Sequence, residues 1–315
     1  MKRFVAHRNP RHARRRRDWP RINANLVQRG NLTVWIAEDA IARWERPPRT
    51  GQPGRPRRYD DLAIRTAYSI KAFFGMPLRQ TEGLLCSIFA LMGVRLAVPN
   101  FSTFSRRMPG LDIELPRRIK PGEAVHLVID STGLKVFGSG EWHQHKHGLR
   151  KRRVYRKLHL LIDADTGDIL ASELTTSSVS DGAMLPILLG RVEEPIAALS
   201  ADGAYDQEPC YRALARRGSR AIIPPRVDAM LRADDGGGGI EMRNENLREI
   251  QRIGKERWKH KRGYYRQSIA ENGMSRYKTI FGERLSCRLF ASQKNEAKLN
   301  TFLLNAMLHL TDQAA

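Results

Sequence analysis

The chain has 315 residues, with 55 Lys and Arg against 33 Asp and Glu, so its formal net charge is +22. Hydrophobic residues make up 41% of it, too many for a disordered chain, and no apolar run approaches the roughly 18 residues that cross a membrane. A chain this basic repels itself unless a polyanion is near, so we expect nucleic acid as its partner and no membrane association.

Residues 1–58 are expected to form a basic arm and linker. Residues 1–60 hold 16 Lys and Arg against 5 Asp and Glu, which is half of the whole excess of positive charge. The four arginines at 14–17 would neutralise phosphates without contacting specific bases. Some local structure is expected around 32–36 and a short helix at about 37–45, before a Pro- and Gly-rich linker at 47–58.

No export signal is evident, because Asp18-Trp19-Pro20 follows the arginines in place of an apolar stretch. The three cysteines, Cys86, Cys210 and Cys287, are far apart and form no CxxC pair. That spacing argues against a structural zinc site and favours a reducing compartment. We therefore expect a cytoplasmic protein associated with the nucleoid.

A helical DNA-binding domain is predicted over 59–115. Apolar residues recur at helical spacing from Tyr59 to about Phe73 and again over 79–92, and a short third helix follows Ser102. This third helix carries Arg106 and Arg107, which we expect to contact DNA. The layout is typical of a helix-turn-helix region, with an ordinary three-helix bundle as the alternative.

An α/β domain is predicted over 120–290, with a mixed sheet flanked by helices. Strands are expected at 124–129, 156–162, 169–174, 196–201 and 220–223, and helices at about 181–189, 207–216 and 268–280. The segment 234–239 (Asp-Asp and four glycines) is expected to be flexible. A last helix at about 294–311, within the region 291–315, is expected to pack on this core.

Two acids are predicted at strand ends, where side chains enter a cleft more readily than a core. Asp130 follows the strand at 124–129, and Asp202 follows the strand at 196–201. Close carboxylates repel each other unless a divalent cation lies between them, and hard oxygen ligands suit Mg²⁺ or Mn²⁺. Glu271, on the late helix, would be a third ligand, so the three acids could hold two ions for a phosphoryl displacement.

The late helix carries further candidates. Tyr264, Gln267 and Lys278 fall on or near the helical face of Glu271, because seven residues are close to two turns. We expect them to hold backbone phosphates. The ordinary explanation of any one of these acids alone is a turn or cap residue.

Several segments resemble bacterial insertion-sequence transposases of the DDE type, close to the insertion-sequence-five group of the insertion-sequence-four superfamily. The matching segments are 59–65 (YDDLAIR), 78–84 (LRQTEGL), 102–107 (STFSRR), 128–135 (VIDSTGLK), 156–159 (RKLH) and 202–206 (DGAYD).

The resemblance implies an RNase H-like catalytic core whose three acids are Asp130, Asp202 and Glu271. The family's last motif has the pattern Y-(2)-R-(3)-E-(6)-K, and Tyr264, Glu271 and Lys278 match it in register. The position of the family Arg is Gln267 here, with Arg266 one place earlier. A shift of one residue rotates a side chain about 100° around a helix, so Arg266 is an imperfect substitute.

Other basic and aromatic residues are further candidates for DNA contact. Lys135 and Lys157 flank the first aspartate in the matching segments. Seven Lys and Arg lie between Lys146 and Lys157, which favours a backbone-contacting segment over a metal site at His143, His145 and His147. Trp258, among cations, could stack on an unpaired base or pack in the core. Asp163 and Asp206 are interpreted as structural or supporting.

The sequence thus predicts a DNA transposase that binds terminal inverted repeats. It would cut the strand with metal-activated water and then join the freed 3′-hydroxyl to target DNA. Pairing two DNA ends implies a homodimer or a larger synaptic assembly. The alternatives are a metal-dependent nuclease or resolvase with the same site, and a catalytically inactive, domesticated DNA-binding protein.

Overall fold

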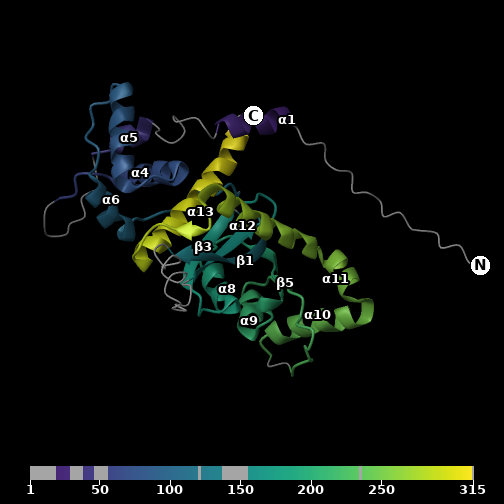
Figure 1. The fold of residues 1–315 in the computed structure, drawn as a ribbon. Coiled ribbons are helices and arrows are strands. Elements are labelled where there is room, and N and C mark those ends of the chain that lie inside the picture. The colour runs from purple at the N-terminus through teal and green to yellow at the C-terminus, as the bar shows by residue number, and fades with distance from the viewer. Residues whose placement is uncertain are drawn as a thin grey trace, which may run out of the picture.

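A computed structural model describes residues 19–28, 38–45, 56–119, 122–136, 155–233 and 236–313. A group of helices near the N-terminus lies beside a mixed sheet that is covered by helices on both faces (Figure 1). The helices outside the sheet domain are α1 (Trp19–Gln28), α3 (Glu38–Arg43), α4 (Asp61–Phe74), α5 (Leu78–Leu91) and α6 (Phe101–Arg107), followed by the 3-10 helix η1 (Met108–Gly110).

The sheet has the strand order β3-β2-β1-β4-β5, with a short β6 that also pairs with β1. Strands β1, β2 and β3 form an antiparallel meander. Strands β4 and β6 each pair with β1 in parallel, and β5 pairs with β4 in parallel. The strands are β1 (Val125–Val136), β2 (Tyr155–Asp163), β3 (Ile169–Thr176), β4 (Ile196–Ser200), β5 (Arg220–Ile222) and β6 (Arg284–Leu285).

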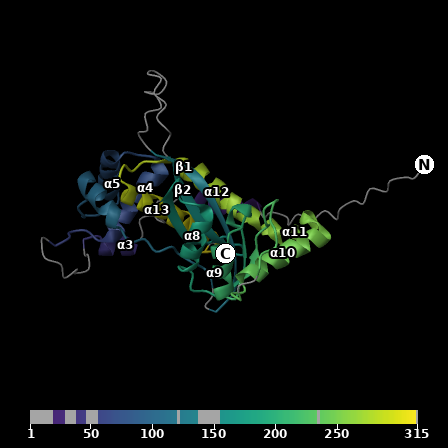
Figure 2. The same ribbon diagram turned by 90° about the horizontal axis from the view of Figure 1, so that it is seen from below.

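Helices cover both faces of this sheet because alternate strand residues point to opposite sides. Leu127 and Ile129 of β1 pack under α8 (Asp181–Leu189) and α9 (Glu208–Arg216). Val128 packs on the other face, under α12 (Ser268–Phe281) and part of α13 (Phe290–Gln313). Helices α10 (Gly239–Ile253) and α11 (Lys255–Arg262) extend beyond the β5 side (Figures 1 and 2), and the 3-10 helix η3 (Tyr264–Gln267) leads from α11 into α12.

Helix α13 belongs to both halves of the molecule. Leu299 and Leu303 are buried in the cluster formed by α4, α5 and α6. Ala297 and Leu304 are buried in the cluster under the sheet. Figure 1 shows this helix running between the N-terminal helices and the strands. The last helix therefore packs on the sheet, as expected, and joins it to the helical region as well.

Element boundaries differ from the prediction at informative places. The first long strand does not end at Asp130 but continues to Val136, because β2 pairs with it along almost its whole length. Helix α1 was not predicted, and it lies within the expected basic arm. Residues 29–37, 46–55 and 137–154, with the local structure expected at 32–36 and the three histidines at 143–147, lie outside the described part of the chain. Among the described residues, no helix is long and apolar enough to cross a membrane.

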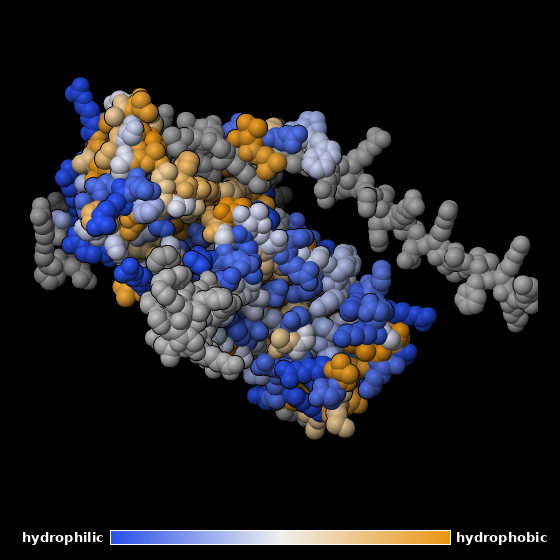
Figure 3. All heavy atoms as spheres, in the orientation of Figure 1, coloured by the Kyte–Doolittle hydropathy of each residue, from blue (hydrophilic) through white to orange (hydrophobic). Residues whose placement is uncertain are grey.

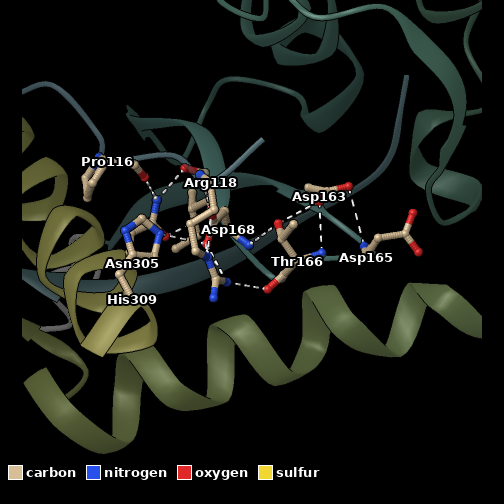
Figure 4. A network of polar contacts seen from close by, with 9 residues as sticks. Pro116, Arg118, Asp163, Asp165, Thr166, Asp168, Asn305 and His309 are labelled. Carbon is tan, nitrogen blue, oxygen red and sulfur yellow. Dashed lines mark hydrogen bonds and ion pairs between the residues drawn. The ribbon is translucent and has the colours of Figure 1, made fainter. Parts of the chain in front are cut away.

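The turn between β2 and β3 is held by its own acids (Figure 4). Asp163 accepts hydrogen bonds from the Thr166 N–H and hydroxyl, at 2.9 and 2.6 Å. Asp168, fully buried, forms an ion pair with Arg118 at 2.8 Å and contacts His309 of α13 at 3.1 Å. Asp163 therefore has the structural role that was predicted for it.

Candidate active site

Asp130 lies on β1, and Asp202 follows the end of β4, its parallel neighbour in the middle of the sheet. Val128 of β1 pairs with Ser200 of β4, and each aspartate follows two residues later. Adjacent strands are about 4.8 Å apart and alternate residues share a face, so this register brings the two carboxylates together. Strand β4 ends at Ser200, and the Asp202 side chain accepts a hydrogen bond of 2.9 Å from the Ala204 N–H in the turn that follows.

Glu271 lies in the first turn of α12, where the partial positive charge of the helix N-terminus stabilises a carboxylate. Its side chain is exposed, whereas Ala270 beside it is fully buried against the sheet. Gly273 allows this close packing, since a Cβ there would come within 2.5 Å of the Ile162 side chain on β2. Helix α12 thus lies close over the sheet face to which Asp130 belongs.

The three acids influence one another electrostatically. Burial, together with the smaller effects of the charges of Asp202, Glu271 and Asp181, raises the pKa of Asp130 to about 6. A hydrogen bond of 2.7 Å from the Ser131 N–H to the Asp130 Oδ1 acts in the opposite direction. Asp130 is therefore a carboxylate that is costly to ionise until a positive charge approaches it.

Tyr264 faces the same negative charges. Burial, with smaller contributions from Asp202, Glu271 and Asp130 in that order, raises its pKa to about 12. The Lys259 ammonium lies 6.0 Å from the centre of its ring. Within the described residues, however, no three His, Cys, Asp or Glu side chains lie close enough together to hold a metal ion.

Gln267, at the position of the family arginine, is buried and bound to the strand that carries the first aspartate. Its Nε2 donates a hydrogen bond of 2.8 Å to the Ile129 carbonyl, one residue before Asp130. The pairing of β1 with β4 ends at Val128, so Gln267 satisfies a carbonyl beyond the end of that ladder. Its Oε1 has no hydrogen-bond partner. The expectation that Gln267 contacts a phosphate is contradicted by this buried position.

Three cations that were predicted to contact DNA are paired with carboxylates. Lys135 at the end of β1 and Lys278 on α12 both approach Glu283, at 3.5 and 3.9 Å. Arg266 forms an ion pair of 2.8 Å with Asp165 in the β2–β3 turn. All three pairs are partly exposed, and such pairs are weak enough to exchange a carboxylate for a phosphate.

The two arginines of the third helix have different surroundings. Arg106 is exposed, and its Nε donates to the Ser102 carbonyl at 3.3 Å. Arg107 instead turns inward, where it donates to the Tyr59 carbonyl at 3.0 Å and forms an ion pair with Asp61. Arg107 thus ties α6 to α4, and the expectation that it contacts DNA is wrong for this conformation.

Trp258 also has a structural position. Its side chain is fully buried, in a cluster with Ala198 of β4 and Ile222 of β5. The Tyr264 ring packs beside it, with the ring centres 6.2 Å apart. A ring enclosed in this way cannot stack on a base, so packing, the second explanation considered for Trp258, is the correct one.

Asp181 is an acid near the site that the sequence reasoning missed. It begins α8, and its Oδ1 lies 3.4 Å from the Lys157 Nζ and 3.7 Å from the buried Nδ1 of His159. Lys157 also donates to the Val179 carbonyl at 2.9 Å. This lysine, expected to contact DNA, therefore holds Asp181 in place near Asp130. Lys157 and His159 are two residues apart on a predicted strand and so share a face, and this spacing could have indicated that an acid lies opposite them.

Asp206 has a supporting role, as predicted. It is buried and forms an ion pair with Arg243 of α10 at 2.9 Å. The Tyr211 hydroxyl donates to it at 3.0 Å, and the Arg226 N–H at 3.1 Å. Its charge is thereby neutralised, and it fixes α10 to the turn after Asp202.

Comparisons with known proteins identify the family of the chain. Residues 27–139 and residues 121–306 each match a family described as "Transposase DDE domain". A solved structure described as the "piggyBac transposase synaptic complex with hairpin DNA" is also similar, at 10% sequence identity and a TM-score of 0.35, over 92% of this chain and 76% of that one. The second family match alone spans more than half of the chain, and the protein therefore belongs to the DDE transposase domain family.

Proposed function

We propose that this chain is a DNA transposase of the insertion-sequence-five group from a bacterial mobile element. It would bind the terminal inverted repeats of that element, cleave a strand at each end and join the 3′-hydroxyl to target DNA. The observation that supports the proposal is the register of β1 and β4, in which Asp130 and Asp202 each follow two residues after the paired Val128 and Ser200, while Glu271 lies on the helix over the same sheet face.

The sheet topology supports an RNase H-like core. An antiparallel meander of three strands, continued by two parallel strands in the order β3-β2-β1-β4-β5, with helices on both faces, is the arrangement expected of that fold. Helices α4, α5 and α6 are the counterpart of the expected helix-turn-helix region, which we propose as the part that binds the repeats.

Asp130, Asp202 and Glu271 are the residues that would hold Mg²⁺ or Mn²⁺. The chemistry of these residues suits such a cation, because hard oxygen ligands carry a mutual repulsion that a divalent charge removes, and the three side chains would have to move closer together than they lie here. When bound, two ions would stabilise the charge that develops on the scissile phosphate and would activate the attacking hydroxyl.

The chain's own groups would then position the DNA. The Tyr264 hydroxyl, whose pKa of about 12 keeps it protonated, can donate a hydrogen bond to a phosphate oxygen. Arg266 and Lys278 can exchange their exposed carboxylate partners for phosphates. In cleavage, water attacks the phosphorus and the 3′-oxygen leaves with a proton. In transfer, that 3′-hydroxyl attacks a target phosphate and displaces a second 3′-oxygen.

The proposal includes partners and place of action. Joining both ends of one element requires two sites, so we propose a homodimer or a larger synaptic assembly. The substrate implies a cytoplasmic, nucleoid-associated protein.

Strand cleavage of a DNA that carries the flanking ends of the gene tests this function. Wild type and Asp202→Asn should be compared in Mg²⁺ and in Ca²⁺. We expect nicks at the element boundary in Mg²⁺ only, none with the variant, and 3′-ends that become joined to a target plasmid. Nicks without joining would favour a nuclease or resolvase, and binding without nicks in Mg²⁺ would favour a domesticated DNA-binding protein.

A further inference from the structure

A groove of about 870 Å³ separates the helical region from the start of the last helix. One wall is formed by the end of α4, the beginning of α5 and α6. The other wall is the segment that joins β6 to α13, from Ser286 to Ser292. None of the described residues that line the groove is Asp or Glu. Four of them carry a positive charge: Lys71, Arg79, Arg106 and Arg288.

Three of these four cations lack a carboxylate partner. Arg79, Arg106 and Arg288 are exposed, and none forms an ion pair with an acid in the described part of the chain. Lys71 differs, because it donates to the Ser286 hydroxyl at 2.7 Å, which in turn donates to Glu296 at 2.5 Å. Considering the described residues alone, at least three positive charges in the groove are therefore uncompensated.

Arginines elsewhere on the protein show the contrast. Arg117 pairs with Glu194 at 3.0 Å, and Arg191 pairs with Glu173 at 2.5 Å. Neighbouring like charges with no counter-charge raise the energy of the folded chain, and a bound polyanion would remove that repulsion. The groove thus has the electrostatic character of a site for a molecule with regularly spaced negative charges.

The lining of the groove also includes apolar side chains, such as Phe101 and Leu289. The Arg79 guanidinium lies 4.2 Å from the centre of the Phe101 ring, a stacking contact that fixes the direction of its N–H groups. Leu289, on the opposite wall, is exposed. Figure 3 shows apolar surface bordered by hydrophilic surface over the N-terminal helices. Apolar side chains can contact the C–H edges of deoxyribose, while the arginines of the groove can contact the phosphates on either side.

The distance between the groove and the candidate active site can be estimated along β1 and β6. Arg284 of β6 pairs with Lys135 of β1, and Ser286 on the groove wall follows two residues later. From Asp130 to Lys135 is five residues, and from Arg284, the partner of Lys135, to Ser286 is two more, so the extended path is about 23 Å. That is about seven base pairs of a duplex at 3.4 Å per pair.

We propose that this groove binds the sugar–phosphate backbone of duplex DNA about seven base pairs from the phosphate that is cut. The inference rests on the proposed transposase function, because it places the held DNA relative to the acids of that site. It assigns Arg79, Arg106 and Arg288 as phosphate contacts and adds a second wall, the β6–α13 segment, to the helical DNA-binding region.

Salt-dependent DNA binding tests the groove. Fluorescence anisotropy with a labelled duplex of about 30 base pairs and arbitrary sequence gives the slope of log Kd against log salt, since phosphate contacts do not depend on sequence. The test variant is Arg79→Gln/Arg106→Gln/Arg288→Gln. A matched control, Arg216→Gln/Arg220→Gln/Arg252→Gln, removes the same charge from exposed arginines of α9, β5 and α10, away from the groove.

Each lost phosphate contact should reduce the slope by about 0.9, which corresponds to an increase of about eightfold in Kd at 0.1 M salt. The groove variant loses three contacts, so its slope should fall by about 2.7 and its affinity by roughly 500-fold. The control should lose far less. Equal slopes for wild type and the groove variant would refute the proposal that the groove binds DNA. Absence of DNA binding by wild type would overturn the proposed function as well.

A cleavage measurement separates the two proposals. A groove variant with a reduced slope, alongside a wild type that binds but never nicks DNA in Mg²⁺, would support the groove and refute the catalytic proposal. Since all three side chains are exposed, their replacement should leave the thermal midpoint unchanged, which circular dichroism can check.

Discussion

Replacing Asp130 with Asn should stabilise the folded protein at pH 8. The pKa of Asp130 is raised to about 6 from its ordinary 3.8, which corresponds to about 3 kcal/mol of unfavourable ionisation. Because the side chain is partly exposed, solvent screening reduces this figure to on the order of 2 kcal/mol. An asparagine keeps the oxygen that accepts the Ser131 N–H and removes the charge, so the variant should melt about 4 °C higher.

The pH dependence gives the sign of the effect. Above pH 6 the folded wild type carries the unfavourable charge, whereas below about pH 4 Asp130 is protonated in both the folded and the unfolded chain. The gain from Asp130→Asn should therefore fall to zero between pH 6 and pH 4. Thermal melts of wild type and variant at pH 4, 6 and 8, without divalent ions, measure it.

Asp206→Asn is the matched control with the opposite expectation. This aspartate is ion-paired with the buried Arg243, and loss of its charge leaves that arginine uncompensated, at a cost of about 3–5 kcal/mol. An Asp130→Asn variant that is no more stable than wild type at pH 8 would refute the reasoning. Added Mg²⁺ should stabilise wild type and leave the Asp130→Asn variant nearly unaffected.

Three further predictions concern packing and acid stability. Gly239→Ala should cost about 1–3 kcal/mol, because its Cβ would lie 2.8 Å from the Arg212 backbone nitrogen, whereas Gly83→Ala, with open space in α5, should be neutral or stabilising in denaturant melts. Trp258→Phe should lower the melting temperature and leave DNA affinity unchanged; weaker binding with unaltered melting would contradict its burial. Burial lowers the pKa of His159 to about 4, so wild type should lose stability as pH falls from 6.5 to 4, and His159→Gln should lose less.

The sheet and its acids were largely predictable from the sequence. Apolar runs located the strands, and an acid next to each of two runs indicated where they meet, because parallel neighbours end at a common edge. The passage of β1 through Asp130 was not predictable, since Ser131-Thr132-Gly133 has weak strand propensity. The partner strand β2 imposes the extended conformation there, with Thr132 opposite Leu158 and Gly133 opposite Lys157.

The roles of the surrounding residues depended on contacts between distant segments. Arg107 pairs with Asp61, which lies 46 residues earlier, so its place on a short basic helix suggested an exposed side chain that the fold turns inward. Trp258 is surrounded in sequence by cations, yet only one face of α11 is solvated and the indole lies on the other. Gln267 occupies the position of an arginine in a motif, and only the end of the β1–β4 ladder explains why an amide serves there.

The double membership of α13 has a mechanical consequence. Because the same helix contributes Leu299 and Leu303 to one core and Ala297 and Leu304 to the other, neither half can shift without breaking apolar contacts in its own interior. In the proposed function, DNA bound by the helical region would therefore be held by a rigid connection at a fixed position relative to the acids. Helix α13 would then set the number of base pairs between the bound DNA and the position that is cut.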